Sequence, residues 1–487
     1  MSLTAGWAAR WRDEPDRVVL VDATHGTAYT AADVESASAV AAHVLAALGV
    51  VPGERVLFSC APSVETVLSY VGILRLGAVV VPANTAYTAA ELQHIVRDVR
   101  PVTAVVDDPE RVPDLPIAAR TNALTRRTPI GLGLVRDVPL DLDRAADDDA
   151  SMIAFTSGTT GRPKGAVLSH GNLRAGAEAL VDAWGWTPDD RLVHALPMFH
   201  MHGLGAAING SLSAGASIVV LPRFDPAGVV DAAAAYDATM FFGVPTMYAR
   251  LRDTGHLPAL SGLRLLVSGS APLDPLLFQA IATQAGQAPI ERYGMSETVM
   301  LTSNPLRGER RAGSVGRPLP GVQVRLGEGG GVEVTGPNVF AGYWERPEAN
   351  AEAFTPDGWF RTGDIGELDA DGHLRLVGRA SDLIITGGYN VYPREVEDAV
   401  LEHPDVLDAA VVGIPDDTWG ETVVAYVVLR ADLASGQADA AGIIAALTAH
   451  VASRLAAYKR PRSWTVVTEL PRNAMGKVRR DLLRDQG

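Results

Sequence analysis

Apolar residues in the first third of the chain occur in two kinds of segment. Residues 34–48 and 64–76 are longer stretches with apolar side chains at helical spacing, and each is followed by a glycine. Residues 55–60 and 78–81 are short and mainly apolar runs. Longer helical segments that alternate with short apolar runs predict an α/β sheet whose strands are joined by crossover helices.

The alternation continues along the chain and then changes. Apolar strand candidates occupy residues 151–155 and 263–267, whereas after residue 322 short β-like pieces alternate with turns. Nearer the C-terminus the alternation of strand and helix patterns returns. We therefore predict an α/β protein with a large N-terminal domain (1–380) and a small α+β C-terminal domain (381–487).

The charge and composition of the chain exclude several classes of protein. It carries 42 Lys and Arg against 57 Asp and Glu, a net charge of −15. This argues against a non-specific nucleic-acid binder, because such proteins need a basic surface. The single cysteine, Cys60, excludes an intramolecular disulfide and any multi-cysteine metal site. Residues 1–12 contain no long apolar stretch and no run reaches 18 apolar residues, which predicts a cytoplasmic protein without membrane insertion.

A segment rich in Gly and Thr follows the predicted strand at 151–155. Its sequence, residues 156–165, is TSGTTGRPKG. Hydroxyl groups and glycines in such a loop let N–H and O–H groups surround a phosphate chain, with a cation nearby. A plain flexible loop is the alternative, but this composition directly after a strand favours phosphate binding. The residues expected to bind phosphate are Thr156, Ser157, Gly158, Thr159, Thr160 and Lys164. The loop is not a Walker A motif, because Lys164 is followed by Gly165 and not by Ser or Thr.

The chain resembles the adenylate-forming enzymes, which include acyl-CoA synthetases, firefly-type luciferases and the adenylation domains of peptide synthetases. Five segments carry the resemblance in the family's order: residues 156–165, 293–297 (YGMSE), 359–364 (WFRTGD), 378–390 (GRASDLIITGGYN) and 471–477 (PRNAMGK). The resemblance covers almost the whole chain. It implies stacked α/β subdomains plus a small β-barrel-like part in the large domain. It also implies a small mobile domain that rotates between adenylate formation and thioester formation.

The resemblance implies ATP, Mg²⁺ and CoA as cofactors and gives roles to several residues. Joining a carboxylate to the α-phosphate of ATP brings two anions together, so the site needs a metal ion and a cation. Carboxylate oxygen suits Mg²⁺, a hard cation. The implied roles are Mg²⁺ binding by Glu297 and Thr160, α-phosphate contact by Ser296, adenine binding by Tyr293, Gly294, Gly269, Ser270 and Ala271, and ribose binding by Asp364 and Arg379. Taken alone, Asp364 would be interpreted as a turn residue and Arg379 as a surface charge.

Three further residues take their roles from the C-terminal motifs. The resemblance makes Lys477 the residue that bridges carboxylate and phosphate during adenylation, and an ammonium group on a flexible stem suits that task. Ser381 occupies the hinge position, where Lys or Asp is commoner in the family. Gly388, with Gly387 before it, would allow a close approach to the pantetheine arm of CoA.

The acyl pocket is expected to be lined by residues from three segments. They are His200, which falls at the family's gating position, with Met201, His202, Ser268 and Met295. A metal site at the two histidines is disfavoured, because no further ligand accompanies them. Arg292 is the informative residue, since a buried arginine needs an anionic partner. That partner is either an acid of the chain, such as Glu291, or a second carboxylate on the substrate.

The wider sequence is most similar to malonyl-CoA synthetases of the MatB type. The resemblance implies that malonate, and also methylmalonate, reacts with ATP and CoA to give malonyl-CoA, AMP and pyrophosphate. The main alternative is an AMP-forming CoA ligase for a short-chain or aromatic monocarboxylic acid, in which Arg292 would form a structural ion pair. A catalytically silent nucleotide-binding protein is disfavoured by Glu297, Asp364 and Lys477. No obligate protein partner is evident.

Overall fold

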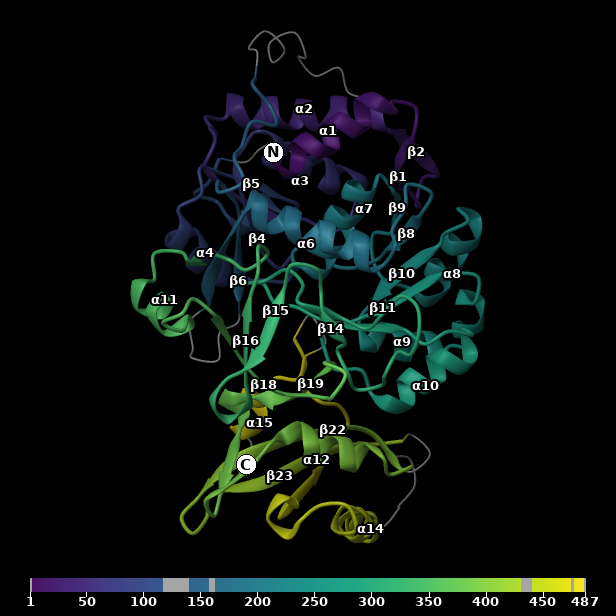
Figure 1. Cartoon of the computed structure of the whole chain (residues 1–487), viewed down its shortest axis with the longest axis vertical. Coiled ribbons are helices and arrows are strands. Elements are labelled where there is room, and N and C mark those ends of the chain that lie inside the picture. The colour runs from purple at the N-terminus through teal and green to yellow at the C-terminus, as the bar shows by residue number, and fades with distance from the viewer. Residues whose placement is uncertain (1, 117–139, 157–162, 431–439, 474–476, 486–487) are drawn as a thin grey trace. The chain divides into compact units, whose positions relative to one another are not determined.

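The computed structural model describes residues 2–116, 140–156, 163–430, 440–473 and 477–485 (Figure 1). The chain divides into two compact units. Unit 1 comprises Met1–Val324 and Val334–Phe360, and unit 2 comprises Arg325–Glu333 and Arg361–Gly487. Among the described residues, no helix is long and apolar enough to cross a membrane.

A nine-stranded sheet is the larger of the two sheets in unit 1. In spatial order its strands are β14 (Arg317–Pro318), β13 (Thr302–Ser303), β12 (Ile290–Tyr293), β11 (Leu265–Ser268), β10 (Met240–Gly243), β8 (Arg191–His194), β9 (Ser217–Val220), β1 (Val18–Asp22) and β2 (Thr27–Thr30). Pairing is parallel from β12 to β1 and antiparallel at both edges. Helices α8 (Pro226–Ala235), α9 (Pro245–Asp253) and α10 (Pro275–Gln284) pack on one face. Each begins with proline, whose missing N–H would have no partner in a first helical turn.

The second sheet of unit 1 has six strands and carries the start of the predicted phosphate loop. In spatial order they are β17 (Gly342–Tyr343), β7 (Lys164–Ser169), β6 (Ala150–Thr156), β4 (Val79–Pro82), β3 (Arg55–Ser59) and β5 (Thr103–Val106). β6 and β7 form an antiparallel pair in which Thr156 lies opposite Lys164, so both ends of the loop are fixed by the sheet. Ser157, Gly158, Thr159 and Thr160 lie outside the described residues.

Further helices belong to unit 1, and most of them begin at a Ser or Thr whose side chain caps the first turn. They are α1 (Leu3–Asp13), α2 (Ala31–Ala47), α3 (Val64–Arg75), α4 (Ala89–Val99), α6 (His170–Ala183), α7 (Asn209–Ala214) and α11 (Pro347–Ala353). Thr30, Thr88 and Ser169 form capping boxes before α2, α4 and α6, each satisfying a backbone N–H that the helix leaves unpaired. Helices α2 and α3, and strands β3, β4, β6 and β11, confirm the predictions made from the apolar spacing.

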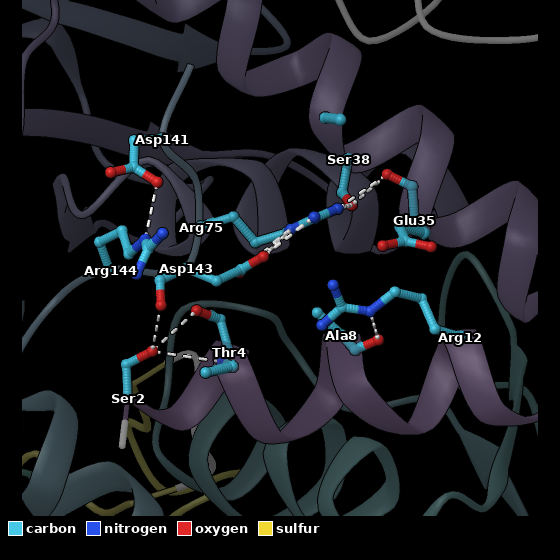
Figure 2. Close-up of polar contacts among 12 residues, drawn as sticks. Ser2, Thr4, Ala8, Arg12, Glu35, Ser38, Arg75, Asp141, Asp143 and Arg144 are labelled. Atoms are coloured by element: carbon cyan, nitrogen blue, oxygen red, sulfur yellow. Dashed lines mark hydrogen bonds and ion pairs between the residues drawn. The ribbon is translucent and has the colours of Figure 1, made fainter. Parts of the chain in front are cut away.

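Arg75 ties α3 to α2 and to the segment that precedes β6 (Figure 2). Its guanidinium is buried and pairs with Asp143 at 3.0 Å, while Nη1 donates to Ser38 Oγ and to the carbonyl of Glu35, both at 2.8 Å. The ring of Trp11 lies 5.7 Å from the guanidinium carbon. Because a carboxylate and several acceptors satisfy this buried charge, Arg75 is a structural residue and provides a contrast to Arg292.

The described residues of unit 2 form two sheets and three α-helices. The first sheet is formed by β15 (Gln323–Leu326), β16 (Gly331–Thr335), β18 (Phe360–Leu368) and β19 (Leu374–Arg379), with β15 starting at the division between the units. The second is formed by β21 (Tyr389–Val391), β20 (Ile384–Thr386), β23 (Gly420–Leu429) and β22 (Val406–Asp416), and β24 (Ser463–Val466) pairs with β23. The helices are α12 (Pro393–Leu401), α14 (Ala440–Ala452) and α15 (Arg480–Arg484). The predicted α/β class is thereby confirmed, while the boundary between residues 380 and 381 stays a prediction.

Candidate active site

Arg292 lies in β12, in the interior of unit 1, without an acidic partner among the residues that the structure describes. It is 6% exposed, and it forms no ion pair with any described residue. Its Nη2 donates to Ser270 Oγ at 3.5 Å, and its Nε has no hydrogen-bond partner among the described residues. Burial lowers the pKa of Arg292 to about 9. The alternative partner, Glu291, accepts instead from the backbone N–H of Gly313 at 3.1 Å. The intrachain ion pair that we considered for Arg292 is therefore absent from the described part of the chain.

The backbone beside Arg292 is shaped to receive its guanidinium. A Cβ added to Gly269 would lie 2.4 Å from Cζ and 2.5 Å from Nε of Arg292, so only glycine leaves room for the group. Ser270 follows with φ of +71°, a left-handed conformation that is uncommon outside glycine. This conformation accompanies the contacts of Ser270 Oγ with Arg292 and with His202 Nδ1, the latter at 3.3 Å. The structure thus brings together four residues predicted separately, two for adenine and two for the acyl group.

A π-helix, η3 (His202–Ile208), supplies the opposite side of this cluster. Helices of this kind are rare and occur frequently at functional sites. His202 is buried, its ring stacks on Phe242 with centroids 6.2 Å apart, and burial and the charge of Arg292 lower its pKa well below the ordinary value. Met201 immediately precedes the helix and is also buried, whereas His200 is half-buried with its ring 4.5 Å from that of Phe199. Ser268 is buried in β11, paired with Glu291.

Two other buried histidines, His170 and His194, are expected to lower the free energy of unfolding in acid. Burial lowers the pKa of His170 and of His194 from 6.5 to about 4. In the unfolded chain both imidazoles regain their ordinary pKa, so the unfolded state binds more protons between pH 6.5 and pH 4. Each histidine is therefore expected to leave stability unchanged above about pH 6.5 and to lower it by about 3 kcal/mol near pH 4. Denaturant unfolding over this range tests the prediction. His170→Gln should flatten the profile, and a wild-type profile that is already flat would contradict it.

Glu297 is the centre of the second group of residues in unit 1. It is buried, and its Oε1 accepts a hydrogen bond from the hydroxyl of Tyr343 at 3.0 Å. Tyr343 belongs to β17, which pairs with β7, and the ammonium of Lys164 lies 5.5 Å from the centroid of its ring. Tyr343 therefore connects the predicted metal ligand to the end of the predicted phosphate loop. The sequence assigned no role to Tyr343, because its partners are distant in sequence and none of the five ordered motifs contains it.

The turn between β12 and β13 holds Glu297 in place through an unusual backbone. Val299 adopts φ of +55°, which is a genuine outlier for a β-branched residue. Three glycines accommodate it: a Cβ at Gly176 or at Gly205 would lie 2.8 or 3.1 Å from Val299 Cγ1, and a Cβ at Gly294 would lie 2.3 Å from its carbonyl oxygen. Asn338 Nδ2 donates to the carbonyls on both sides of Val299, each at 2.7 Å. The turn that carries Met295, Ser296 and Glu297 is thus fixed by contacts with distant segments of unit 1.

Asp364 and Arg379, both predicted to bind ribose, are direct neighbours in unit 2. They lie opposite each other in β18 and β19, and Arg379 Nε is 2.8 Å from Asp364 Oδ1. Asp364 is buried, and its backbone N–H donates to Thr362 Oγ1 at 3.1 Å. The antiparallel register, which no local pattern reveals, brings the two residues together.

The remaining predicted residues of unit 2 occupy turns and loops. Ser381 is exposed in the short 3₁₀ turn Ala380–Asp382. Gly387 and Gly388 connect β20 and β21 with φ of +56° and +79°, and two successive left-handed residues are what a tight hairpin of this kind requires. Lys477 is exposed, and its backbone N–H donates to Asn473 Oδ1 at 3.0 Å.

Comparison with known proteins places these residues in a family context. Residues 7–344 match the model of AMP-binding enzymes, and residues 395–477 match the model of the AMP-binding enzyme C-terminal domain. The malonate–CoA ligase of Arabidopsis thaliana is 34% identical over 479 residues, covering 90% of this chain and 78% of the relative. The sulfoacetate–CoA ligase of Cupriavidus necator is 35% identical over 499 residues, covering 98% and 96%. The structure of ATP-bound MatB from Rhodopseudomonas palustris is 38% identical, with a TM-score of 0.90 over 100% of this chain and 99% of that one.

Proposed function

Because the chain belongs to the family of AMP-binding enzymes, we propose that it is a malonyl-CoA synthetase. It is an AMP-forming acid–CoA ligase that uses ATP, Mg²⁺ and CoA. In the proposed reaction, malonate, and also methylmalonate, is converted to malonyl-CoA with release of AMP and pyrophosphate. The substrates are small molecules.

Arg292 is buried and forms no ion pair with any described residue, and this observation supports a dicarboxylic acid as the substrate. A guanidinium kept from water costs free energy unless an anion pairs with it, and a carboxylate can accept two of its parallel hydrogen bonds. A monocarboxylic acid uses its only carboxylate at the reacting phosphate and leaves Arg292 without a partner. The second carboxylate of malonate would supply that partner. Both relatives named above are ligases for short acids with a second anionic group.

The first half-reaction joins the acid to the nucleotide. We assign the phosphate chain to Thr156 and Lys164, the adenine to Tyr293 and Gly294 beside Ala271, the α-phosphate to Ser296, and the ribose hydroxyls to Asp364 and Arg379. A carboxylate oxygen of the acid attacks the α-phosphorus, and the bond to the bridging oxygen breaks to release pyrophosphate. Lys477 brings its positive charge to the two approaching anions. His200 borders the path of the acyl group.

The second half-reaction forms the thioester. The sulfur of CoA attacks the carbonyl carbon of the acyl-adenylate, and the bond to the phosphate oxygen of AMP breaks. Gly387 and Gly388, which lack side chains at the tip of an exposed hairpin, are assigned to the pantetheine arm.

The residues around Glu297 fit a Mg²⁺ ion. A buried carboxylate provides hard oxygen ligands, and the Tyr343 hydroxyl, which donates to one of them, would orient the group. Glu297 would hold the ion together with the phosphates of ATP and with Thr160. When bound, Mg²⁺ supplies positive charge that offsets the charge of the phosphate chain.

Removing the hydroxyl of Tyr343 is expected to weaken the use of Mg²⁺. Tyr343→Phe keeps the ring beside Lys164 but leaves Glu297 Oε1 without this donor. Loss of a residue that orients a metal ligand typically lowers metal affinity about 10- to 100-fold. ATP–pyrophosphate exchange titrated with Mg²⁺ should therefore show a higher half-saturating Mg²⁺ concentration, with an unchanged KM for malonate. An unchanged Mg²⁺ titration would mean that the hydroxyl has no such role.

A panel of acids tests the proposed substrate. AMP release would be measured with ATP, Mg²⁺, CoA and one of acetate, butyrate, octanoate, benzoate, malonate, methylmalonate or succinate. Malonate and methylmalonate are expected to exceed the monocarboxylic acids by orders of magnitude in kcat/KM, because a monocarboxylic acid provides no partner for Arg292. If a monocarboxylic acid is the best substrate, the adenylation chemistry remains but the dicarboxylate assignment is wrong.

A further inference from the structure

Residues 471–473 and 477–479 of unit 2 form the two arms of a short antiparallel hairpin. The backbone N–H of Asn473 donates to the carbonyl of Lys477 at 2.8 Å, and the next pair of residues outward forms an antiparallel bridge. We call this the lysine hairpin, because Lys477 is the first residue of its second arm. The position of Lys477 therefore depends on what holds this hairpin and on what closes it.

Two arginines fix the lysine hairpin to the rest of unit 2. Arg472, in the first arm, has its Nη2 2.6 Å from Asp408 Oδ2 in β22. Arg480, which follows the second arm, donates to Glu397 Oε1 in α12 at 2.6 Å. The carboxylate of Glu397 is buried and also accepts from the backbone N–H of Val411, in β22, at 2.9 Å. Because each arm has its own anchor, the base of the hairpin is fixed against α12 and β22.

The side chain of Asn473 makes a second connection between the two arms. Its Oδ1 accepts from the backbone N–H of Lys477 at 3.0 Å, while the main-chain bond runs in the opposite direction. Asn473 therefore holds both polar backbone groups of Lys477, the N–H and the C=O. These two bonds fix the direction in which the side chain of Lys477 leaves the backbone. An ammonium on a long flexible stem reaches a given target only if the backbone starts in the right place.

We propose that Asn473 is a positioning residue for adenylation, which holds the backbone of Lys477 so that the ammonium reaches the carboxylate of the acid and the α-phosphate. This inference rests on the proposed function, because it needs the role that we assign to Lys477. Asn473 takes no part in bond making or breaking, and its whole effect passes through Lys477. The thioester-forming step, to which Lys477 is not assigned, should therefore not depend on Asn473.

Two substitutions of Asn473 separate the acceptor oxygen from the rest of the side chain. Asn473→Ala removes the acceptor for the Lys477 N–H, whereas Asn473→Asp keeps an acceptor oxygen at the same position. With the best acid of the panel, ATP–pyrophosphate exchange reports adenylation, and AMP release from the acyl-adenylate and CoA reports thioester formation. Asn473→Ala is expected to lower exchange about 10- to 100-fold and to leave thioester formation within about twofold, because a displacement of about 1 Å can cost about 100-fold in rate. Asn473→Asp is expected to recover most of the exchange.

A matched control and a double variant show whether the effect passes through Lys477. Asp369 closes the turn between β18 and β19 in the same manner, since its Oδ1 accepts from the backbone N–H groups of Asp371 and His373 at 2.9 and 2.8 Å. Asp369→Ala should leave the ratio of the two rates unchanged. In the double variant Asn473→Ala/Lys477→Ala, exchange should be no lower than in Lys477→Ala alone.

Unchanged exchange in Asn473→Ala, equal loss of both rates, or a further loss in the double variant would overturn the proposal. Both rates are measured on the same preparation, so a smaller folded fraction lowers them together and does not imitate the expected result. If Asn473→Ala does not fold, Asn473→Leu replaces it, because leucine has a similar size and no acceptor. A wrong choice of substrate would appear in the panel of acids and would leave the ratio of the two rates intact, so the two failures are distinguishable.

Discussion

Lys477→Ala is expected to abolish formation of the acyl-adenylate while thioester formation from supplied malonyl-AMP continues. Adenylation brings the carboxylate of the acid to the α-phosphate, and the repulsion between these anions must be offset in the transition state. The second step has no such encounter, because the acid already carries AMP. Removing one well-placed stabilising group commonly lowers a rate by about 10²–10³.

The two half-reactions can be measured separately in this variant. ATP–pyrophosphate exchange with malonate reports adenylation, and release of AMP from malonyl-AMP and CoA reports thioester formation. Lys459 provides a matched control, because it is paired with Glu395 within unit 2. Lys459→Ala should leave the ratio of the two rates unchanged. Equal loss of both half-reactions in Lys477→Ala would show that Lys477 does not have the assigned role.

Arg292→Ala is expected to raise the KM for malonate about 100-fold or more and to leave the KM for ATP nearly unchanged. Removing one member of a buried, hydrogen-bonded charge pair costs about 2–5 kcal/mol, because the other charge is then buried alone. Arg292→Ala also removes a buried cation that has no acidic partner among the described residues, and propionate has no second carboxylate to pair with that cation. The ratio of kcat/KM for propionate to kcat/KM for malonate should therefore rise. Steady-state AMP release with both acids measures this reversal.

Arg310 offers a matched control for this substitution. It is also partly buried in unit 1, but it donates to the backbone carbonyls of Pro305, Leu306 and Ala288. Arg310→Ala should lower the melting temperature without changing selectivity between acids. If Arg292→Ala behaves in the same way, Arg292 is a structural residue and the acyl pocket lies elsewhere.

The parts of the fold that were predicted correctly are those with a local signal. Apolar spacing located α2 and α3, because each has apolar residues toward the core and is followed by a glycine. The five ordered motifs predicted the adenylate-forming fold, which the family match confirms. By contrast, every residue of η3 is buried, so no alternation of polar and apolar positions marks it as a helix or identifies its π-helical geometry.

The relations within the site depend on contacts between distant segments. Tyr343 reaches Glu297 only because β17 pairs with β7 in one particular register. The sequence identified Arg292 as a residue in need of an anion. Only the three-dimensional structure shows that no described acid forms an ion pair with it. The contact of Ser270 Oγ with His202 Nδ1 accompanies a left-handed backbone at Ser270 that has no signature in the sequence.

The conformation of Val299 has a consequence for how this site tolerates mutation. Its left-handed backbone would suit glycine, yet the residue is a valine, and the space it needs is created by Gly176 in α6, Gly205 in η3 and Gly294 in the turn after β12. Alanine at Gly176 would crowd only the side chain of Val299, so a smaller residue at position 299 would relieve that contact. These positions are therefore epistatic, and substitutions that are each deleterious alone become acceptable in combination. Surveys of single mutants would thus classify as invariant a set of positions that can change together.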